Sequence, residues 1–370
     1  MNNALVIFVS TPLIKRDIKI YGVEYYRNNG VEVWFFNFWP LFSKGLSHKA
    51  DIDFNNQINI DSIGTLIKEL WKFKKLKAEF LSDISLNPKT YILYLILTIF
   101  RINYSFVDNW YVLLPKRKYD KIKITILRLM KLLMKKPKYI FMPNKRSFHS
   151  RSIAGKESIV IPYASFNYDD FLSTENKDCN EQLINGKYFV FIDQYLTDLP
   201  DFARMGSKSP LTNNYYKSLN SFLKELAIKT NIKYAVAGHP RRLTKESDVF
   251  DSFDVYFYKT YQLIKDADFI VAHYSNSIYW AVILEKPILF IKTQEMKSTF
   301  IEKIIDAFAS ELKQSVYNID TSNFSVNEIQ FSIDKHTYNL FKKNHIVYNS
   351  STKEKTYEII HKTLYVNKTK

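Results

Sequence analysis

The feature that most restricts the fold of this chain is the regular alternation of short apolar runs and amphipathic stretches in its second half. Strand-like apolar runs occupy residues 188–193, 233–238, 255–258, 269–272 and 287–291. Helix-like stretches lie between them, such as residues 215–229, where apolar residues recur at i, i+3, i+4 and i+7 from Leu219. Strand and helix in alternation predict an α/β fold, with a parallel sheet covered by helices on both faces.

The first half is less regular, but it begins in the same way. A strand-like run at residues 5–9, a helix-like stretch and a second run at residues 31–36 predict a parallel α/β unit. Further strands are expected at residues 139–142 and at the start of 159–171, where an aromatic loop follows. A basic stretch at residues 63–80 resembles a helix.

A chain of 370 residues is long enough for two domains. The clearest change in composition is the polar segment 173–186, so the domain boundary is expected there. We predict a first domain over residues 1–175 and a second over residues 186–345. Residues 346–370 are expected to form a C-terminal helix that packs back on the first domain.

The formal net charge of +16 favours acidic partners, such as nucleic acid, anionic lipid or phosphate-bearing substrates. Residues 116–138 contain ten Lys or Arg and one acid, with apolar residues at roughly helical spacing. A basic amphipathic helix is typical of binding to an anionic membrane surface. The solvated face of an ordinary helix is the alternative interpretation.

Membrane-spanning and disulfide-bonded classes are not expected. The longest apolar run, residues 91–100, is shorter than the roughly 20 residues that a spanning helix needs. The N-terminal sequence lacks the basic start of a secretory signal. The single cysteine, Cys179, excludes a disulfide framework and a cysteine-based zinc site. The expected location is cytoplasmic, either soluble or peripheral at the inner face of the cytoplasmic membrane.

Polar residues follow three of the predicted strands of the second half. Asp193, His239 and His273 each come directly after an apolar run. Because ligands of open parallel sheets bind beyond the carboxyl ends of the strands, these residues are candidates for a site. Each also has a purely structural interpretation, as a cap or as a buried polar group.

Two short segments suit a phosphate. Ser275, Asn276 and Ser277 precede a predicted helix, whose first N–H groups and positive dipole end favour an anion. Simple N-capping is the alternative. His239-Pro240 is followed by Arg241 and a second arginine, which adds a donor and two cations.

Other common signatures are absent or weak. Neither a P-loop nor a dinucleotide-binding glycine motif occurs in the sequence. Asp51-Ile52-Asp53 has the D-x-D form that binds metal in one class of glycosyltransferases, but so short a pattern is common by chance. No metal site and no cofactor are therefore predicted.

The segments VFIDQYLTDLPDF, AVAGHPRR and ADFIVAHYSNSIYWAVILEKPILFI resemble the C-terminal half of bacterial surface-polysaccharide glycosyltransferases of the GT-B fold. The closest likeness is to enzymes that use CMP-sugars, namely capsule and O-antigen β-Kdo transferases and sialyltransferase-like proteins. The resemblance covers about residues 188–292. It implies two Rossmann-like domains with a cleft between them, of which the first would bind the acceptor and the second the nucleotide sugar.

The resemblance also implies roles for individual residues. Asp193 corresponds to the strand-end Asp that is the proposed nucleophile in retaining β-Kdo transferases. His239 and Pro240 correspond to the HP motif, and Ser275 and Ser277 to the serines at the helix start, which together bind the CMP phosphate. The remaining candidates are the neighbours His273 and Asn276, the cation Arg241, and Glu285, which stands where many GT-B enzymes keep an acid for the ribose.

The expected function is transfer of a CMP-activated ulosonic or nonulosonic acid, Kdo or sialic-acid-like, to a lipid-linked saccharide acceptor of capsule or O-antigen synthesis. A GT-B transferase that uses a UDP-, GDP- or dTDP-sugar is the alternative within the class, and retention or inversion stays open. The alternative from another class is a basic nucleic-acid-binding protein. Against it, the aromatic residues lie largely in apolar runs and no nucleic-acid-binding module is recognisable.

Overall fold

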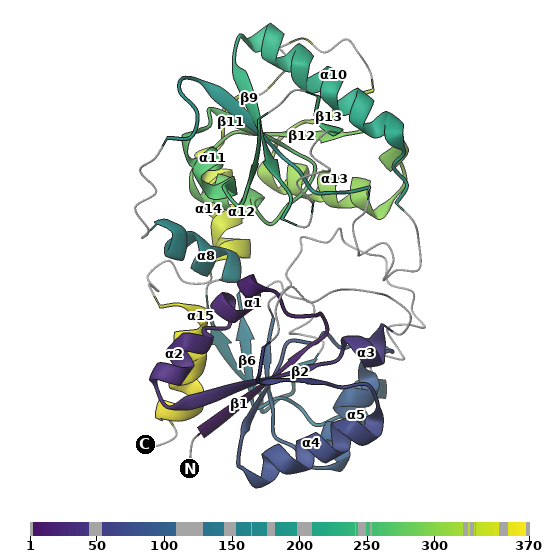
Figure 1. Ribbon diagram of the computed structural model, residues 1–370, viewed down its shortest axis with the longest axis vertical. Coiled ribbons are helices and arrows are strands. Elements are labelled where there is room, and N and C mark those ends of the chain that lie inside the picture. The colour runs from purple at the N-terminus through teal and green to yellow at the C-terminus, as the bar shows by residue number, and fades with distance from the viewer. Residues whose placement is uncertain are drawn as a thin grey trace. The chain divides into compact units, whose positions relative to one another are not determined.

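The computed structural model describes residues 3–43, 54–108, 129–143, 153–163, 165–175, 182–197, 209–240, 242, 249–251, 254–320, 325, 329, 331–347 and 354–367. They form two compact units (Figure 1). The first unit takes in most of the chain up to Asp169 together with the C-terminal segment from Val347. The second unit runs from Asp170 to Ile346.

The first unit is built on a seven-stranded sheet in the order β3-β2-β1-β4-β5-β6-β7, and every pair of neighbours is parallel. The strands are β1 (Asn3–Val9), β2 (Val31–Asn37), β3 (Gln57–Asn59), β4 (Glu79–Ser82), β5 (Ser105–Val107), β6 (Tyr139–Met142) and β7 (Ile159–Pro162). The helices are α1 (Lys15–Ile20), α2 (Val23–Asn28), α3 (Trp39–Phe42), α4 (Ile63–Lys75), α5 (Tyr91–Ile99), α8 (Phe166–Glu175), within which the unit boundary falls, and α15 (Thr356–His361), which continues as a π-helix, η5 (Lys362–Val366).

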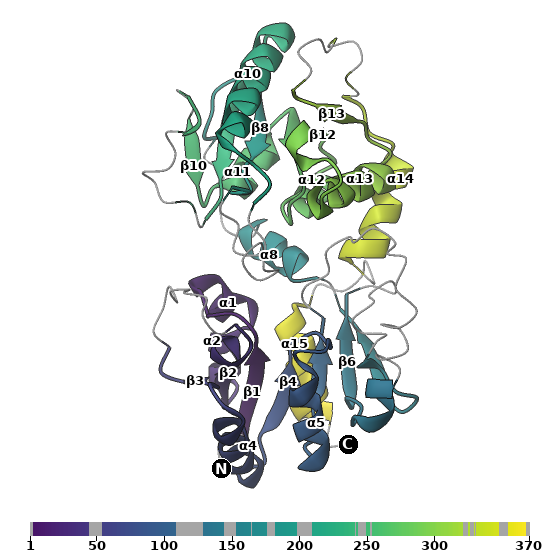
Figure 2. The same cartoon turned by 90° about the vertical axis from the view of Figure 1, so that its right-hand side faces the viewer.

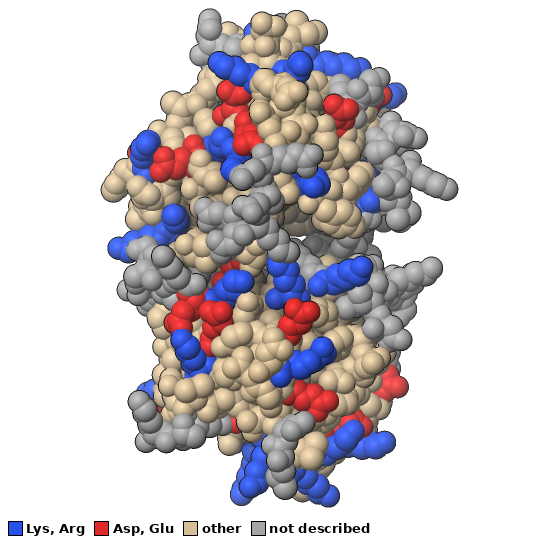
Figure 3. Space-filling model, turned by 60° about the vertical axis from the view of Figure 1, so that its left-hand side comes forward, with Lys and Arg blue, Asp and Glu red and all other residues tan. Residues whose placement is uncertain are grey.

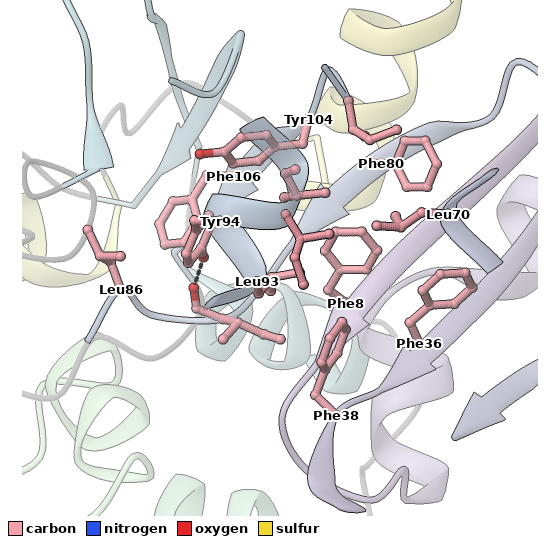
Figure 4. Packing of buried hydrophobic residues seen from close by; sticks show 14 of the residues in the cluster. Phe8, Phe36, Phe38, Leu70, Phe80, Leu86, Leu93, Tyr94, Tyr104 and Phe106 are labelled. Atoms are coloured by element: carbon pink, nitrogen blue, oxygen red, sulfur yellow. Dashed lines mark hydrogen bonds between the residues drawn. The ribbon is translucent and has the colours of Figure 1, made fainter. Parts of the chain in front are cut away.

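Both faces of this sheet are buried, because strand β1 sends alternate side chains to opposite sides. Val6 and Phe8 join a core cluster with residues of α4 and α5, whereas Leu5 and Ile7 join a second cluster with residues of α2 and α15. Figure 4 shows the first cluster, where the Phe8 ring lies 5.6 Å from the ring of Phe36. The near-continuous apolar sequence of β1 is thus the sequence of a strand covered on both faces.

The second unit has a six-stranded parallel sheet in the order β10-β9-β8-β11-β12-β13. Its strands are β8 (Tyr188–Ile192), β9 (Lys233–Gly238), β10 (Val255–Phe257), β11 (Phe269–Ala272), β12 (Ile288–Lys292) and β13 (Val316–Asn318). Its helical segments are α10 (Asn213–Thr230), α11 (Thr260–Asp266), α12 (Ile278–Ile283), η2 (Gln294–Met296), α13 (Phe300–Leu312), α14 (Lys335–Phe341) and η4 (Lys342–Ile346).

Counted along the chain, the strands of the second sheet are ordered 3-2-1-4-5-6, the order of the Rossmann fold. The first sheet has the same order with one strand added at the β7 edge. Each unit is therefore a Rossmann-like α/β domain, as the resemblance to GT-B glycosyltransferases implied. In each sheet the direction of winding reverses between the first and fourth strands, β1 and β4 or β8 and β11, and this switch point is where such folds bind ligands.

The C-terminal helix α15 packs on the first unit, beside α2 (Figure 1). The Tyr26 hydroxyl donates to the Tyr357 carbonyl at 3.1 Å, and Ile360 and Leu364 enter the core cluster on that side. At the start of the helix the Thr356 N–H donates to an Asp169 carboxylate oxygen at 2.8 Å. Residues at the two ends of this unit's sequence thus share one core.

Some elements differ from the sequence-based expectation. The aromatic loop expected within residues 159–171 is in part helix α8, and the stretch 63–80 contains both helix α4 and the start of strand β4. Most of the longest apolar run forms helix α5, in which Leu93, Tyr94, Ile96 and Leu97 are buried. Among the residues that the structure describes, no helix is long and apolar enough to cross a membrane.

Candidate functional site

Strands β9, β8 and β11 are neighbours in the second sheet and end at the same level. Ile192, the last residue of β8, pairs with Ala237 of β9 and with Ala272 of β11. The residues that follow these strands, Asp193, His239 and His273, therefore lie at one carboxyl edge, where the sequence predicted a site. This edge includes the switch point between β8 and β11.

Asp193 is buried and both of its carboxylate oxygens are engaged. Oδ1 accepts from the Tyr195 N–H at 2.9 Å and from Arg242 Nη2 at 3.1 Å. Oδ2 accepts from Arg242 Nε at 2.7 Å and from the His239 N–H at 3.2 Å. Four donors, two of them on a guanidinium, hold the carboxylate in place. Such a charge-assisted, two-point pair is among the strongest hydrogen-bonded arrangements in proteins.

The same carboxylate holds both ends of the HP segment. The Arg242 N–H donates to the His239 carbonyl at 2.9 Å, which closes a four-residue turn. Asp193 binds the first residue of this turn through its N–H and the last through its guanidinium. We call this arrangement, Asp193 with the turn from His239 to Arg242, the Asp–Arg clamp.

The guanidinium of the clamp is enclosed by aromatic rings. Arg242 Cζ lies 4.7 Å from the ring centroid of Tyr195 and 5.1 Å from that of Phe250, and Nη2 donates to the Tyr216 hydroxyl at 2.8 Å. Burial opposes the charge of Arg242, but the hydrogen bonds and the charge of Asp193 outweigh burial and raise its pKa. Arg242 therefore remains charged, and its counter-ion is fixed.

The clamp presents His239 at the rim of the site. Its side chain is half-buried, and the Tyr195 ring stacks on the imidazole at a centroid distance of 6.2 Å. Pro240, the next residue, is exposed, and its carbonyl accepts from the Tyr258 hydroxyl at 3.4 Å. Arg241 lies outside the described residues. The HP segment thus presents the His239 imidazole on a turn that Asp193 holds through its two ends.

His273 has the structural role, that of a buried polar group, which the sequence left open as an alternative. Its side chain has no exposed surface, Nδ1 donates to the Ile291 carbonyl at 2.7 Å, and Nε2 accepts from the Tyr215 hydroxyl at 3.0 Å. Burial lowers the pKa of His273 to about 4, so the ring is neutral near pH 7. Because both ring nitrogens are hydrogen-bonded within the second unit, we do not propose that His273 binds the sugar donor.

The segment Ser275–Ser277, which we call the serine turn, follows β11 and lies at the carboxyl edge. Ser275 and Ser277 are half-buried, Asn276 is exposed, and Ser275 Oγ accepts from the Ser277 N–H at 3.1 Å. The Ile278 N–H is bonded to the Ser275 carbonyl at 3.1 Å, so the turn itself uses part of the donor set expected at the helix start. The Tyr274 N–H donates to Gln194 Oε1 at 3.0 Å, which ties this turn to the end of β8.

Glu285 is not part of this cluster. It follows the far end of α12, three residues before β12 begins, and the neighbouring Lys286 Nζ donates to the carbonyl of Ala267, just before β11. Glu285 thus lies beside the amino ends of these strands, where its carboxylate pairs with Lys335 Nζ at 3.3 Å. The ribose-binding role that the resemblance implied is not supported by this position.

Comparison with solved structures agrees with this architecture. Wall teichoic acid polymerase TagF, in its H548A form, matches with a TM-score of 0.54 and 12% identity, covering 99% of this chain and 89% of that one. S. aureus MnaA, solved with UDP, matches with a TM-score of 0.51 and 13% identity, covering 99% of this chain and 97% of that one. No protein-family model matches the sequence, and the comparison with curated proteins gave no match.

The fold is GT-B. Within it, the residue that sequence reasoning did not assign to the site is Arg242. The sequence indicates it only as one of two adjacent cations, whereas in the fold it is buried and bonded to Asp193, 49 residues away. The sequence of a GT-B domain gives no local signal for such a pair, because its partners end different strands.

Proposed function

We propose that this protein is a glycosyltransferase of bacterial surface-polysaccharide synthesis that binds a nucleotide-sugar donor at the carboxyl edge of the second unit. The observation that carries this proposal is the arrangement of Asp193, His239 and Ser275 at the ends of three adjacent parallel strands, beside a Rossmann switch point. The GT-B fold supports it, since TagF, a polymerase of a cell-wall polymer, has the same fold.

In this proposal His239 and the serine turn bind the donor phosphate. The half-buried imidazole can donate to a phosphate oxygen, and the hydroxyls of Ser275 and Ser277 add neutral donors. As the bond between the anomeric carbon and the phosphate oxygen breaks, charge grows on the leaving phosphate. Donors that are already in position stabilise that charge without reorganising. No metal ion and no cofactor are required in this scheme.

The role of Asp193 separates into two hypotheses. As a nucleophile it would form a bond from one carboxylate oxygen to the anomeric carbon while the nucleotide departs, and water or the acceptor would later break that bond. As the anchor of the Asp–Arg clamp it positions His239 and touches no substrate. The four donors on its two oxygens favour the clamp. The nucleophilic role stays a prediction.

The proposed donor is a CMP-activated ulosonic or nonulosonic acid, because the HP segment and the serine turn resemble those of CMP-sugar enzymes. A UDP-sugar is the second candidate, favoured by the likeness to MnaA, which was solved with UDP. The proposed acceptor is a lipid-linked saccharide, bound by the first unit.

A thermal-shift panel of CMP, CDP, UDP, GDP and dTDP tests the donor site. A nucleotide at about 100 times its Kd should stabilise the protein by roughly 2.7 kcal/mol. We expect CMP to raise the Tm most, and His239→Ala to remove the response. His336→Ala, an exposed histidine on α14, is the matched control and should respond like the wild type.

Three results would count against these assignments. Stabilisation by UDP or GDP without a response to CMP would refute the CMP donor and leave the transferase. An unchanged response in His239→Ala would remove this histidine from the site. Salt-sensitive retention on heparin with no response to any nucleotide would favour the nucleic-acid-binding alternative.

A further inference from the structure

One surface of the first unit combines exposed apolar side chains with a high density of lysine. It is formed by α4, the end of α5 and residues 129–136, and we call it the basic apolar face. Trp71 is 47% exposed, Ile99 65% and Leu132 80%, which is unusual for side chains of this size. Four more large apolar residues on the same segments are also exposed: Ile63, Leu76, Leu129 and Leu133.

Direct contacts show that these three segments form one surface. The Trp71 ring of α4 lies 6.2 Å from the ring of Phe100, which follows α5, and Lys74 Nζ donates to the Phe100 carbonyl at 2.9 Å. The Lys135 N–H donates to Thr98 Oγ1 at 2.6 Å. Helices α4 and α5 also share the core cluster beneath, and Met130 and Met134 anchor the third segment in it.

The charge on this face is almost entirely positive. Residues 63–77 contain five lysines and one acid, Glu69, and residues 129–138 contain four lysines and no acid. The Oε2 atom of this one acid, Glu69, lies 3.9 Å from Lys72 Nζ. Partial burial lowers the pKa of Lys135, and the charges of Lys74 and Arg101 lower it further. Figure 3 shows Lys and Arg side chains gathered at the lower end of the first unit, where α4 lies in Figures 1 and 2.

We propose that the basic apolar face docks on an anionic lipid bilayer. Leu132, Leu133 and Ile99 enter the boundary between headgroups and acyl chains, Trp71 lies at the headgroup level, and the lysines meet the lipid phosphates. The sequence predicted membrane binding from residues 116–138. The structure describes only the end of that stretch, and it adds α4 and α5, which the sequence did not connect with it.

The mixture of side chains distinguishes a bilayer from the other acidic partner, nucleic acid. Binding of single strands without sequence preference relies on aromatic platforms, and Trp71 is the only aromatic residue among the exposed large apolar side chains of this face. Aliphatic side chains gain free energy by leaving water for hydrocarbon, about 25 cal/mol per Å² of buried area. This inference does not rest on the proposed function, because vesicle binding needs no nucleotide and no acceptor.

The test is co-sedimentation of the full chain with two kinds of vesicle, phosphatidylcholine alone and phosphatidylcholine mixed with phosphatidylglycerol, at low and high salt. We expect binding only to the mixed vesicles, weakened by salt. Lys131→Gln, Lys135→Gln and Lys136→Gln together should lower the partition coefficient about 100-fold at low salt, since each lysine is worth about fivefold.

A second variant separates charge from insertion. Leu132→Ser with Leu133→Ser keeps every charge and should weaken binding at both salt concentrations. The matched control is Ile228→Ser on α10 of the second unit, because Ile228 is 80% exposed, as Leu132 is. It should bind like the wild type. Unchanged thermal stability of each variant shows that the chain is folded.

Several outcomes would overturn the proposal. They are equal binding to both kinds of vesicle, no binding to the mixed vesicles, wild-type binding by either face variant, and an equal loss in Ile228→Ser. Binding to single-stranded DNA that the three lysine substitutions abolish, without any binding to vesicles, would assign the face to nucleic acid. A normal nucleotide response in a protein that ignores vesicles would leave the proposed function intact.

Discussion

Replacing Asp193 by Asn tests the structural basis of the site most sharply. The Asp193 and Arg242 side chains are each only 2% exposed, so the guanidinium has no water to replace its partner. Removing one member of a buried ion pair costs about 3–5 kcal/mol. For a domain of this size about 1 kcal/mol changes the Tm by about 2–4 °C, so we expect Asp193→Asn to lower the Tm by roughly 10 °C.

Thermal and urea denaturation of the full chain measure this effect. Arg242→Met should also destabilise the protein, and the double variant should cost less than the two single changes together, with a coupling of about 1–3 kcal/mol. Asp251→Asn is the matched control. It breaks a pair with Lys224 in the same unit whose side chains are about half exposed, and it should cost less than about 1 kcal/mol.

Nucleotide binding then separates the two hypotheses for Asp193. If it anchors the clamp, Asp193→Asn loosens the His239 turn and weakens CMP binding as well as sugar transfer. If it is the nucleophile, Asp193→Asn binds CMP normally, transfers almost no sugar and lacks the sugar adduct that intact-mass analysis would find on the wild type. A variant as stable as the wild type, with normal CMP affinity and no transfer, would refute the clamp.

Two further predictions concern stability. Unfolded chains protonate His273 near pH 6.5 but the folded chain only near pH 4, so the unfolded state binds more protons in between. His273 by itself should therefore lower the free energy of unfolding by about 3 kcal/mol as the pH falls from 6.5 to 4, whereas Asp169, whose pKa burial raises to about 7, contributes in the opposite direction. Urea titrations at several pH values measure this slope, and an equal slope in His273→Gln would contradict it. Gly22→Ala should detach α15, because Gly22 has φ of +63° and a Cβ there would lie 2.3 Å from the Tyr357 ring. The cost is about 2–4 kcal/mol. Hydrogen exchange of the α15 amides reports the detachment. Gly30→Ala is the control, because Gly30 has φ of +72° but a Cβ there would meet no atom within 4 Å, and α15 amides should exchange in this variant as slowly as in the wild type.

Much of the architecture could be predicted from the sequence, since it follows from local periodicity. The strands at residues 188–192, 233–238 and 269–272 and the helix at residues 300–312 are apolar runs and amphipathic stretches whose pattern is visible without the fold. Their alternation predicted a parallel sheet, and the fold class is confirmed. The carboxyl edge could also be anticipated, because polar residues that end parallel strands meet at one edge of the sheet.

The sequence could not decide what each polar side chain does at that edge. His239 and His273 both follow apolar strands, yet one is half-buried on a turn and the other is enclosed with both nitrogens bonded. Exposure depends on which helices cover each strand end, and residues distant in the sequence supply those helices. The family resemblance likewise implied a ribose-binding role for Glu285, but the parallel direction of β12 puts this residue at the opposite edge of the sheet.

The sequence by itself determined most strands and helices of the second unit and the edge where polar residues collect, because backbone periodicity and burial pattern are local properties. Only the tertiary structure decided that Asp193 holds Arg242 and that Trp71, Ile99 and Leu132 share one surface. Both results come from residues on separate elements, which sheet order and helix packing bring together. A linear pattern does not show which distant residues come into contact. The free energy of burying an ion pair or of exposing a leucine depends directly on those contacts.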